Sequence, residues 1–261
     1  RMTGFASGAE PTGPTVGPGS TRDEQSVSRA VQSMFNGIAP RYDLLNHVLS
    51  ANVDRIWWSR TARVFAPILR NPDSAVLDLC CGTGDMTLAL LRLRPANGKP
   101  VVALDFSHQM LERAKEKFAS PEFSSFGVIT TEADALHMPM ADNSIDLITT
   151  AFGFRNLANY EAGLREMARV LRPGAQLGIL DFNEPGGLFG KIYSLYFRHI
   201  LPRIGRTLSG ASAPYEYLPH SVHRFPKPDK MLAMLRACGF VQATWTPYTF
   251  GIAGLYRAVK A

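Results

Sequence analysis

The apolar positions of this chain follow two alternating patterns. Short, nearly continuous apolar runs are typical of buried strands, and the stretches between them space their apolar residues as helices do. The runs predict strands at residues 75–79, 101–105, 126–131, 145–151 and 176–182, and the spacing predicts helices at residues 85–94, 108–118 and 160–171. Repeated alternation of strand and helix predicts an α/β fold with a parallel, doubly wound sheet.

The C-terminal part of the chain breaks this alternation. A helix predicted at residues 229–238 is closed by Gly239, and strands at residues 240–246 and 250–259 follow with no helix between them. Strands joined directly pair as an antiparallel hairpin. The sequence therefore predicts a doubly wound, mostly parallel seven-stranded sheet with a C-terminal antiparallel hairpin.

Three segments lie outside the alternation. Residues 1–26 contain many Gly and Pro and few large apolar side chains, which predicts a disordered leader. Residues 27–70 predict an N-terminal helical cover that includes a helix at residues 55–69. Residues 186–228 are too long for a connection, which usually has roughly 2–6 residues, so they predict a lid or substrate element. We expect a single domain over residues 27–261.

Composition limits the size of the core, the cellular location and the bound groups that we expect. With 261 residues and 46% hydrophobic content, the chain can build one core. It has no apolar stretch of about 18 residues and no signal sequence at its start, so we expect a cytoplasmic protein, peripheral to the membrane at most. The three cysteines predict no disulfide framework, and no His or Cys stands at ligand spacing from Cys80 and Cys81, so no metal is expected.

The formal charge of +6 is concentrated near the predicted lid. Residues 186–230 hold seven Lys and Arg against two acidic residues. Such a stretch favours an anionic partner, either nucleic acid or an acidic membrane surface. Its aromatic part, residues 188–198, would suit a helix lying in a membrane interface, and equally a buried helix of the same domain.

The strongest chemical signal follows the first predicted strand. That strand ends in the loop of Gly82 and Gly84, a helix follows, and the second strand ends at Asp105, 21 residues after Gly84. An acidic residue roughly 20 residues beyond such a loop binds a ribose at the edge of a doubly wound sheet. The pattern therefore predicts a cofactor that contains adenosine.

Details of the loop disfavour a dinucleotide. Thr87 replaces the third glycine, and Asp85 places a negative charge where a diphosphate would bind. The pattern Asp78-x-x-x-Gly82-x-Gly84 instead resembles the first motif of class I S-adenosylmethionine-dependent methyltransferases, whose sheets also end in an antiparallel hairpin. Carboxylates suit that cofactor because its sulfonium and amino groups are cationic.

A third element supports this resemblance. Asp134 and Ala135 follow the third predicted strand, where such enzymes hold the adenine through an acidic side chain and a neighbouring backbone N–H. The residues expected to bind S-adenosyl-L-methionine are Asp78, Gly82, Thr83, Gly84, Asp105, Asp134 and Ala135.

Further segments resemble one family of these enzymes. Residues 34–46, with a Tyr-Asp-x-x-Asn motif, and residues 152–157, with a Phe-Gly-x-Arg-Asn motif, are similar to signatures of the quinone-biosynthesis C-methyltransferases. That family acts on demethylmenaquinol and 2-methoxy-6-polyprenyl-benzoquinol. The turn at residues 169–175 and the segments at residues 201–205 and 215–218 are similar to the same family. The second signature has a phenylalanine where leucine is commoner.

The resemblance implies methyl transfer to a ring carbon of a quinol. That carbon becomes electron-rich when a neighbouring hydroxyl loses its proton, and the protein must hold both reactants together and exclude water. We expect Arg155 to stabilise the developing oxyanion, Asn156 to orient that oxygen or a water, and Tyr42 to close the site. Because an arginine keeps its proton in proteins, a water would accept the proton. Less readily, the acceptor is one of the histidines near the lid, His199, His220 or His223.

The expected reaction is the C-methylation of demethylmenaquinol, slightly favoured by the resemblance at Cys80-Cys81. Alternatives are the benzoquinol of ubiquinone biosynthesis, another small molecule such as a sterol or phenol, or an inactive subunit of a quinone-synthesis complex. An enzyme acting on RNA or DNA is disfavoured, because residues 152–155 occupy the place of its common Asn/Asp-Pro-Pro-Tyr/Phe motif. The expected partners are a polyprenyl quinol and, transiently, a membrane surface, with a homodimer allowed and no nucleic acid.

Overall fold

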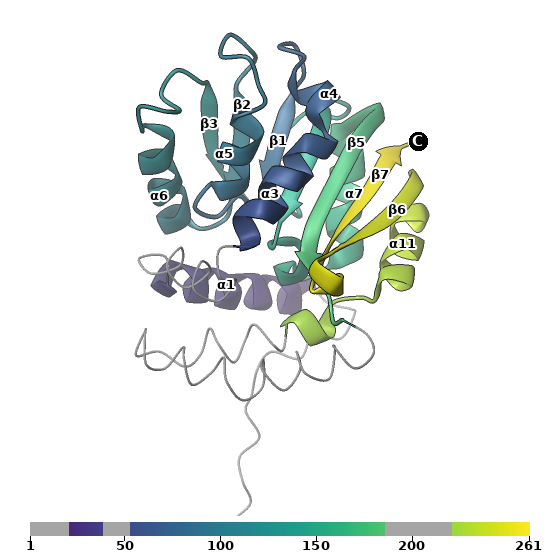
Figure 1. The fold of residues 1–261 in the computed structure, drawn as a ribbon. Coiled ribbons are helices and arrows are strands. Elements are labelled where there is room, and N and C mark those ends of the chain that lie inside the picture. Colours follow the sequence, from purple (N-terminus) through teal and green to yellow (C-terminus); the bar gives the residue numbers. More distant parts are fainter. Residues whose placement is uncertain (1–20, 39–52, 186–220) are drawn as a thin grey trace, which may run out of the picture.

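One sheet organises the protein (Figure 1). The computed structural model describes residues 21–38, 53–185 and 221–261. Across these residues, seven strands form a sheet in the order β3-β2-β1-β4-β5-β7-β6. The strands are β1 (Val76–Leu79), β2 (Val101–Asp105), β3 (Val128–Glu132), β4 (Ile145–Ala151), β5 (Leu171–Phe182), β6 (Phe240–Tyr248) and β7 (Ala253–Lys260). Strands β1 to β5 are parallel and β7 is antiparallel to both β5 and β6, so the predicted α/β sheet with its C-terminal hairpin is confirmed.

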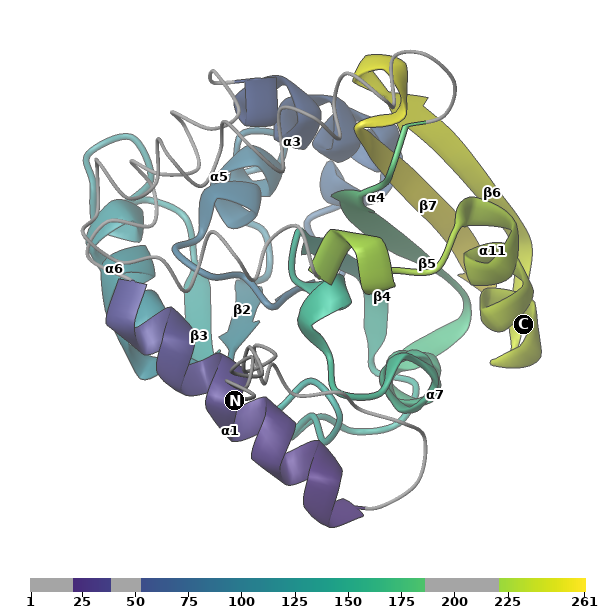
Figure 2. The same ribbon diagram turned by 90° about the horizontal axis from the view of Figure 1, so that it is seen from below.

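Helices cover both faces of this sheet (Figures 1 and 2). Helices α3, α5 and α6 lie on one face, and α7 and α11 lie on the other. Helix α1 crosses the edge at which the parallel strands end, at the bottom of Figure 1. The helices are α1 (Thr21–Ile38), α3 (Val53–Val64), α4 (Ala66–Leu69), α5 (Asp85–Leu91), α6 (His108–Phe118), α7 (Tyr160–Val170) and α11 (Pro228–Ala237), with the short 3-10 helices η2 (Phe154–Asn156) and η4 (Thr249–Gly251).

The central apolar runs form strands because both of their faces are buried. In β1, Leu77 and Leu79 belong to the core cluster on the α7 side, whereas Val76 belongs to the cluster with α3 and α5. Successive side chains of a strand point to opposite faces, so a strand covered on both faces is apolar along its length. Every residue of β1 is buried, and this includes Asp78.

Several predicted boundaries differ from the structure by a few residues, and two of the differences have a local reason. The helix predicted at residues 55–69 is divided at Phe65 into α3 and α4, because Pro67 has no N–H with which to continue the hydrogen bonds of α3. Strand β5 begins earlier than predicted, at Leu171, which pairs with Ile145 of β4 before the register shifts. The turn predicted to precede this strand is therefore part of it.

Helix α1 begins at Thr21, inside the segment predicted to be a leader. It lies against the end of β2, where Gln32 Nε2 donates a hydrogen bond to the carbonyl of Phe106 and the Ser107 hydroxyl donates to Asn36 Oδ1 over 2.6 Å. Tyr42 and most of the predicted lid, up to residue 220, lie outside the described residues. None of the described helices is long and apolar enough to cross a bilayer.

Candidate active site

A cavity opens at the carboxyl ends of the parallel strands. It encloses about 670 Å³, partly open to solvent, and its walls come from α1 and from the loops that follow β1, β2, β3 and β4. A smaller hollow of about 380 Å³ adjoins it and shares residues such as Gly82 and Phe152. Open α/β sheets bind their ligands at this edge, so we treat the two cavities as one candidate site.

The cavity has an acidic side, formed by the loops after β1, β2 and β3. Of the predicted cofactor contacts, Gly82, Asp105, Asp134 and Ala135 line the larger cavity, and Thr83 lines the smaller hollow. Among the described residues, the charged groups that line the two cavities are Asp85, Asp105 and Asp134, all acidic. The arrangement therefore suits a ligand that carries positive charge.

Asp105 connects the ends of β1 and β2. Its Oδ2 accepts a hydrogen bond from the backbone N–H of Gly82 over 2.8 Å, and its Oδ1 accepts from the N–H of Ser107 over 2.9 Å. Burial raises the pKa of Asp105 to about 6, from the usual 3.8. A carboxylate oxygen has two lone pairs, so each oxygen of Asp105 can still accept a hydrogen bond from a ligand in the cavity.

Asp78 and Gly84 support the loop from outside the cavity. Asp78 is fully buried and accepts hydrogen bonds from the hydroxyls of Thr87 and Thr149, over 2.6 and 3.2 Å. Burial raises its pKa to about 7. Gly84 begins α5 with a φ of +87°, where an added Cβ would stand 2.6 Å from the ring of Phe118. Neither residue lines a cavity, so their expected direct contact with a cofactor has no support in this geometry.

Lys117 was not expected at this site. Its Nζ lies 3.0 Å from the hydroxyl of Thr83 and 2.8 Å from Oδ1 of Asp85. The ion pair offsets the charge of Asp85, on which the sequence argument against a diphosphate partly rested. Lys117 lies at the end of α6 and reaches the loop only through the fold, so no sequence pattern indicated the contact.

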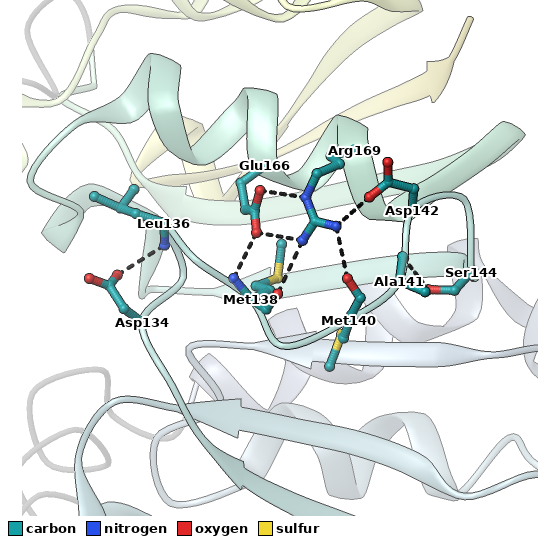
Figure 3. A network of polar contacts seen from close by, with 9 residues as sticks. All are labelled: Asp134, Leu136, Met138, Met140, Ala141, Asp142, Ser144, Glu166 and Arg169. Carbon is teal, nitrogen blue, oxygen red and sulfur yellow. Dashed lines mark hydrogen bonds and ion pairs between the residues drawn. The ribbon is translucent and has the colours of Figure 1, made fainter.

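The β3–β4 connection, which carries Asp134 and Ala135, is held by α7 (Figure 3). Within the described residues Arg169 donates five hydrogen bonds: two to Glu166, one to Asp142 and one each to the carbonyls of Met138 and Met140. Glu166 Oε1 also accepts from the N–H of Met138 over 2.7 Å. The hydrogen bonds from Arg169 hold the pKa of Glu166 below its usual value, so this carboxylate stays charged.

The other half of the cavity is formed by the loop after β4 and is here called the aromatic side, after Phe152 and the rings packed behind it. Phe152 lines both cavities, and its ring lies 4.5 Å from that of Phe182 and 5.9 Å from that of Trp57. Gly153 follows, and an added Cβ there would collide with Cys80 of the loop after β1. Burial and the nearby Asp105 raise the pKa of the Cys80 thiol, which therefore stays protonated.

Arg155 is placed differently from the prediction. Its guanidinium donates to Asp181 Oδ1 over 2.9 Å and to the carbonyl of Phe152, and its backbone N–H donates to Asp181 Oδ2 over 3.0 Å. Both side chains are buried, at 7% and 0% exposed. Since Arg155 does not line the cavity and its charge is paired, the geometry argues against its predicted contact with a substrate oxygen. Asp181, at the end of β5, is the residue that the sequence analysis missed.

Asn156 remains at the cavity. It lines the wall beside Gly153, and its Nδ2 lies 3.4 Å from the carbonyl of Phe152. His223 is exposed and lies 2.9 Å from Oε1 of Glu184, outside the residues that line either cavity. His199 and His220 fall outside the described part of the chain, as Tyr42 does.

Comparison with solved structures identifies the fold. A structure from Thermotoga maritima, described as a SAM-dependent methyltransferase and possible histamine N-methyltransferase, matches with a TM-score of 0.59 at 15% sequence identity and covers 88% of this chain and 100% of its own. The sheet order and the cleft at its carboxyl edge thus place the protein in the class I methyltransferase fold.

Comparison of sequences identifies the family within this class. The model of the ubiE/COQ5 methyltransferase family matches residues 21–260. Demethylmenaquinone methyltransferase from Deinococcus radiodurans is 46% identical, covering 91% of this chain and 95% of that protein. The ubiquinone/menaquinone biosynthesis C-methyltransferase UbiE from Geotalea daltonii is 41% identical over 88% and 96%. The chain belongs to the ubiE/COQ5 methyltransferase family, which confirms the family resemblance.

Proposed function

We propose that this protein transfers the methyl group of S-adenosyl-L-methionine to a ring carbon of a polyprenyl quinol, with demethylmenaquinol as the substrate. The observation that carries the proposal is the division of the cavity: the charged groups on its described walls are carboxylates, and the wall after β4 presents the ring of Phe152. The first suits a cationic methyl donor and the second a flat, apolar acceptor. The name of the Deinococcus radiodurans relative supports this choice of substrate, and that of the Geotalea daltonii relative covers both quinones.

The residues on the acidic side of the cavity fit S-adenosyl-L-methionine. Asp105 would accept hydrogen bonds from the ribose hydroxyls, and Asp134 with the N–H of Ala135 would hold the adenine. Gly82 and Thr83 would adjoin the methionine portion, because no described residue stands within 4 Å of where a side chain on Gly82 would begin. The bound donor would supply an electrophilic methyl group on a cationic sulfur.

The protein's own contribution to the reaction is position and exclusion of water. The ring of Phe152, fixed between Trp57 and Phe182, would present a flat face to the quinol. Asn156 would orient the ring oxygen or the water that accepts its proton. Arg155 would act indirectly, by fixing the carbonyl of Phe152 and the turn of η2, and Tyr42 would close the site.

Methylation by the purified protein tests this function. We expect S-adenosyl-L-methionine carrying a labelled methyl group to label demethylmenaquinol, with mass spectrometry placing the methyl on the quinol ring. Three parallel reactions contain 2-methoxy-6-polyprenyl-benzoquinol, a panel of sterols and phenols, or transfer RNA. Faster labelling of the benzoquinol would reassign the substrate within the family, and labelling of the panel or the RNA alone would overturn the proposal.

A further inference from the structure

Two large apolar side chains protrude from neighbouring parts of the surface. Ile56, on α3, is 64% exposed, and Phe250, on η4 between β6 and β7, is 83% exposed. The residues next to them are joined, because Trp57 Nε1 donates a hydrogen bond to the hydroxyl of Thr249 over 2.8 Å. Figure 2 shows the same proximity, with α3 beside the turn that connects the two last strands.

The backbone at η4 adopts a conformation that costs energy. Thr249 and Phe250 have φ values of +44° and +57°, in the left-handed region that a bulky residue rarely adopts. Glycine or asparagine would suit this turn better. The turn nevertheless holds the Phe250 ring at the surface.

Positive charge surrounds these two side chains. Arg55, Arg60 and Arg63 are exposed on α3, and the Arg60 guanidinium lies 4.2 Å from the centre of the Tyr248 ring, beside the turn. No Asp or Glu occurs from residue 55 to residue 70 or from residue 239 to residue 261. The surface of α3 and η4 therefore combines exposed apolar tips with three exposed arginines, and the one acidic residue of α3, Asp54, is buried.

This surface lies one layer of side chains from the cavity. Trp57, next to Ile56, is buried, and its ring lies 5.9 Å from that of Phe152, which lines the cavity. A ligand that arrived from an apolar phase at this surface would be near the aromatic side of the site.

We propose that Arg55, Ile56, Arg60 and Phe250, here called the docking surface, bind the surface of an anionic lipid bilayer. Exposed Phe and Ile side chains would insert at the boundary of headgroups and acyl chains, and the arginines would contact lipid phosphates. Nucleic acid would use the arginines and leave the apolar tips in water, so a bilayer accounts for both features. The inference goes beyond methyl transfer, and its test requires no catalysis.

Vesicle flotation with the full-length chain tests the proposal. We expect binding to vesicles of phosphatidylcholine with phosphatidylglycerol, weak binding to phosphatidylcholine alone, and loss of binding in high salt. Removing one arginine, as in Arg60→Gln, should weaken binding about fivefold. The double variant Ile56→Asn/Phe250→Asn should weaken it at least about tenfold, since it removes both apolar tips. Asparagine tolerates the left-handed conformation at residue 250, which protects the fold.

Matched controls come from elsewhere on the surface. Ile129→Asn removes an apolar side chain, 52% exposed, from β3 at the opposite edge of the sheet, and Arg236→Gln removes an exposed cation from α11. Both should bind vesicles like the unchanged protein. The proposal fails if the unchanged protein ignores anionic vesicles, if the controls weaken binding equally, or if only a DNA duplex binds and only Arg60→Gln affects it. Methylation of a short-chain quinol in detergent should survive in every variant, so failure of docking and failure of the reaction are distinguishable.

Discussion

Charged residues are placed differently on the acidic and the aromatic side of the cavity. On the acidic side, Asp105 and Asp134 line the open space, although each also accepts a backbone hydrogen bond. On the aromatic side, Arg155 and Asp181 neutralise each other inside the protein, and the ring of Phe152 and the side chain of Asn156 line the cavity. One side thus offers carboxylates to a ligand, whereas the other uses a buried ion pair to hold an uncharged wall in place.

Breaking the buried pair should have the largest effect. Asp181→Ala leaves the Arg155 guanidinium buried without its partner, which should lower the free energy of unfolding by about 3–5 kcal/mol. Urea unfolding followed by circular dichroism measures this loss. The double change Arg155→Met/Asp181→Leu, which removes both charges, should recover most of it. If Asp181→Ala unfolds like the unchanged protein and only turnover falls, Arg155 has a chemical role after all.

Removing a cavity carboxylate should instead affect ligand binding. Asp105→Asn keeps the shape but loses the charge that favours the ribose hydroxyls, so affinity for S-adenosyl-L-methionine should fall by about 1.5–3 kcal/mol, measured by isothermal titration calorimetry. Glu132→Gln is the matched control, because Glu132 is the residue of β3 that lies opposite Asp105 of β2 in the sheet, and it lines neither cavity. Equal losses in the two variants would separate Asp105 from the binding site.

The raised pKa of Asp105 predicts how binding depends on pH. Its carboxyl has a pKa of about 6 in the folded protein and 3.8 as the usual value, so its contribution to stability is complete below about pH 3.8 and is lost as pH rises through 6. A cationic ligand with hydroxyl donors favours the ionised form. The affinity for S-adenosyl-L-methionine should therefore rise by up to about tenfold per pH unit between pH 5 and 6 and then level off. Below pH 6, binding should release the proton of Asp105.

Calorimetry in two buffers of different ionisation enthalpy measures that proton release. Asp105→Asn should abolish both the release and the rise in affinity near pH 6. The same pH profile in the variant would assign the effect to another group, of which Asp78 is the first to examine, since burial raises its pKa to about 7.

The same comparison shows what the sequence could predict. The bounds of β2 and β4 were predicted without error, because uninterrupted apolar runs ending at a polar or small residue reflect burial on both faces. The place of Asp105 beside the glycine loop at the cavity could also be predicted, since the two stand at a fixed spacing set by one βαβ unit.

The arrangement of the aromatic side could not be predicted from such a pattern. Arg155 in η2 and Asp181 at the end of β5 are 26 residues apart in the sequence, and the pairing of β4 with β5 brings them together. A sequence shows an arginine beyond a strand but not whether its partner is a substrate or a buried carboxylate. Thr87 illustrates the same limit: it replaces a glycine in the motif, and its hydroxyl binds Asp78 in the core.

The smallest effect should come from the support of the acidic side. Arg169→Lys keeps the charge but loses the planar fork that joins Glu166 to the carbonyls of Met138 and Met140, so the β3–β4 connection should loosen. The KM for S-adenosyl-L-methionine should rise a few-fold, by about 1 kcal/mol, with kcat nearly unchanged, because the connection carries Asp134 and no residue of the aromatic side. Arg172→Lys is the control. Arg172 stands just beyond the end of α7, and its guanidinium donates to Asp146 and to the carbonyl of Asn143 rather than to residues 134–140. Steady-state kinetics should separate the two variants, and a fall in kcat for Arg169→Lys at unchanged KM would mean that the two sides are mechanically coupled rather than independent.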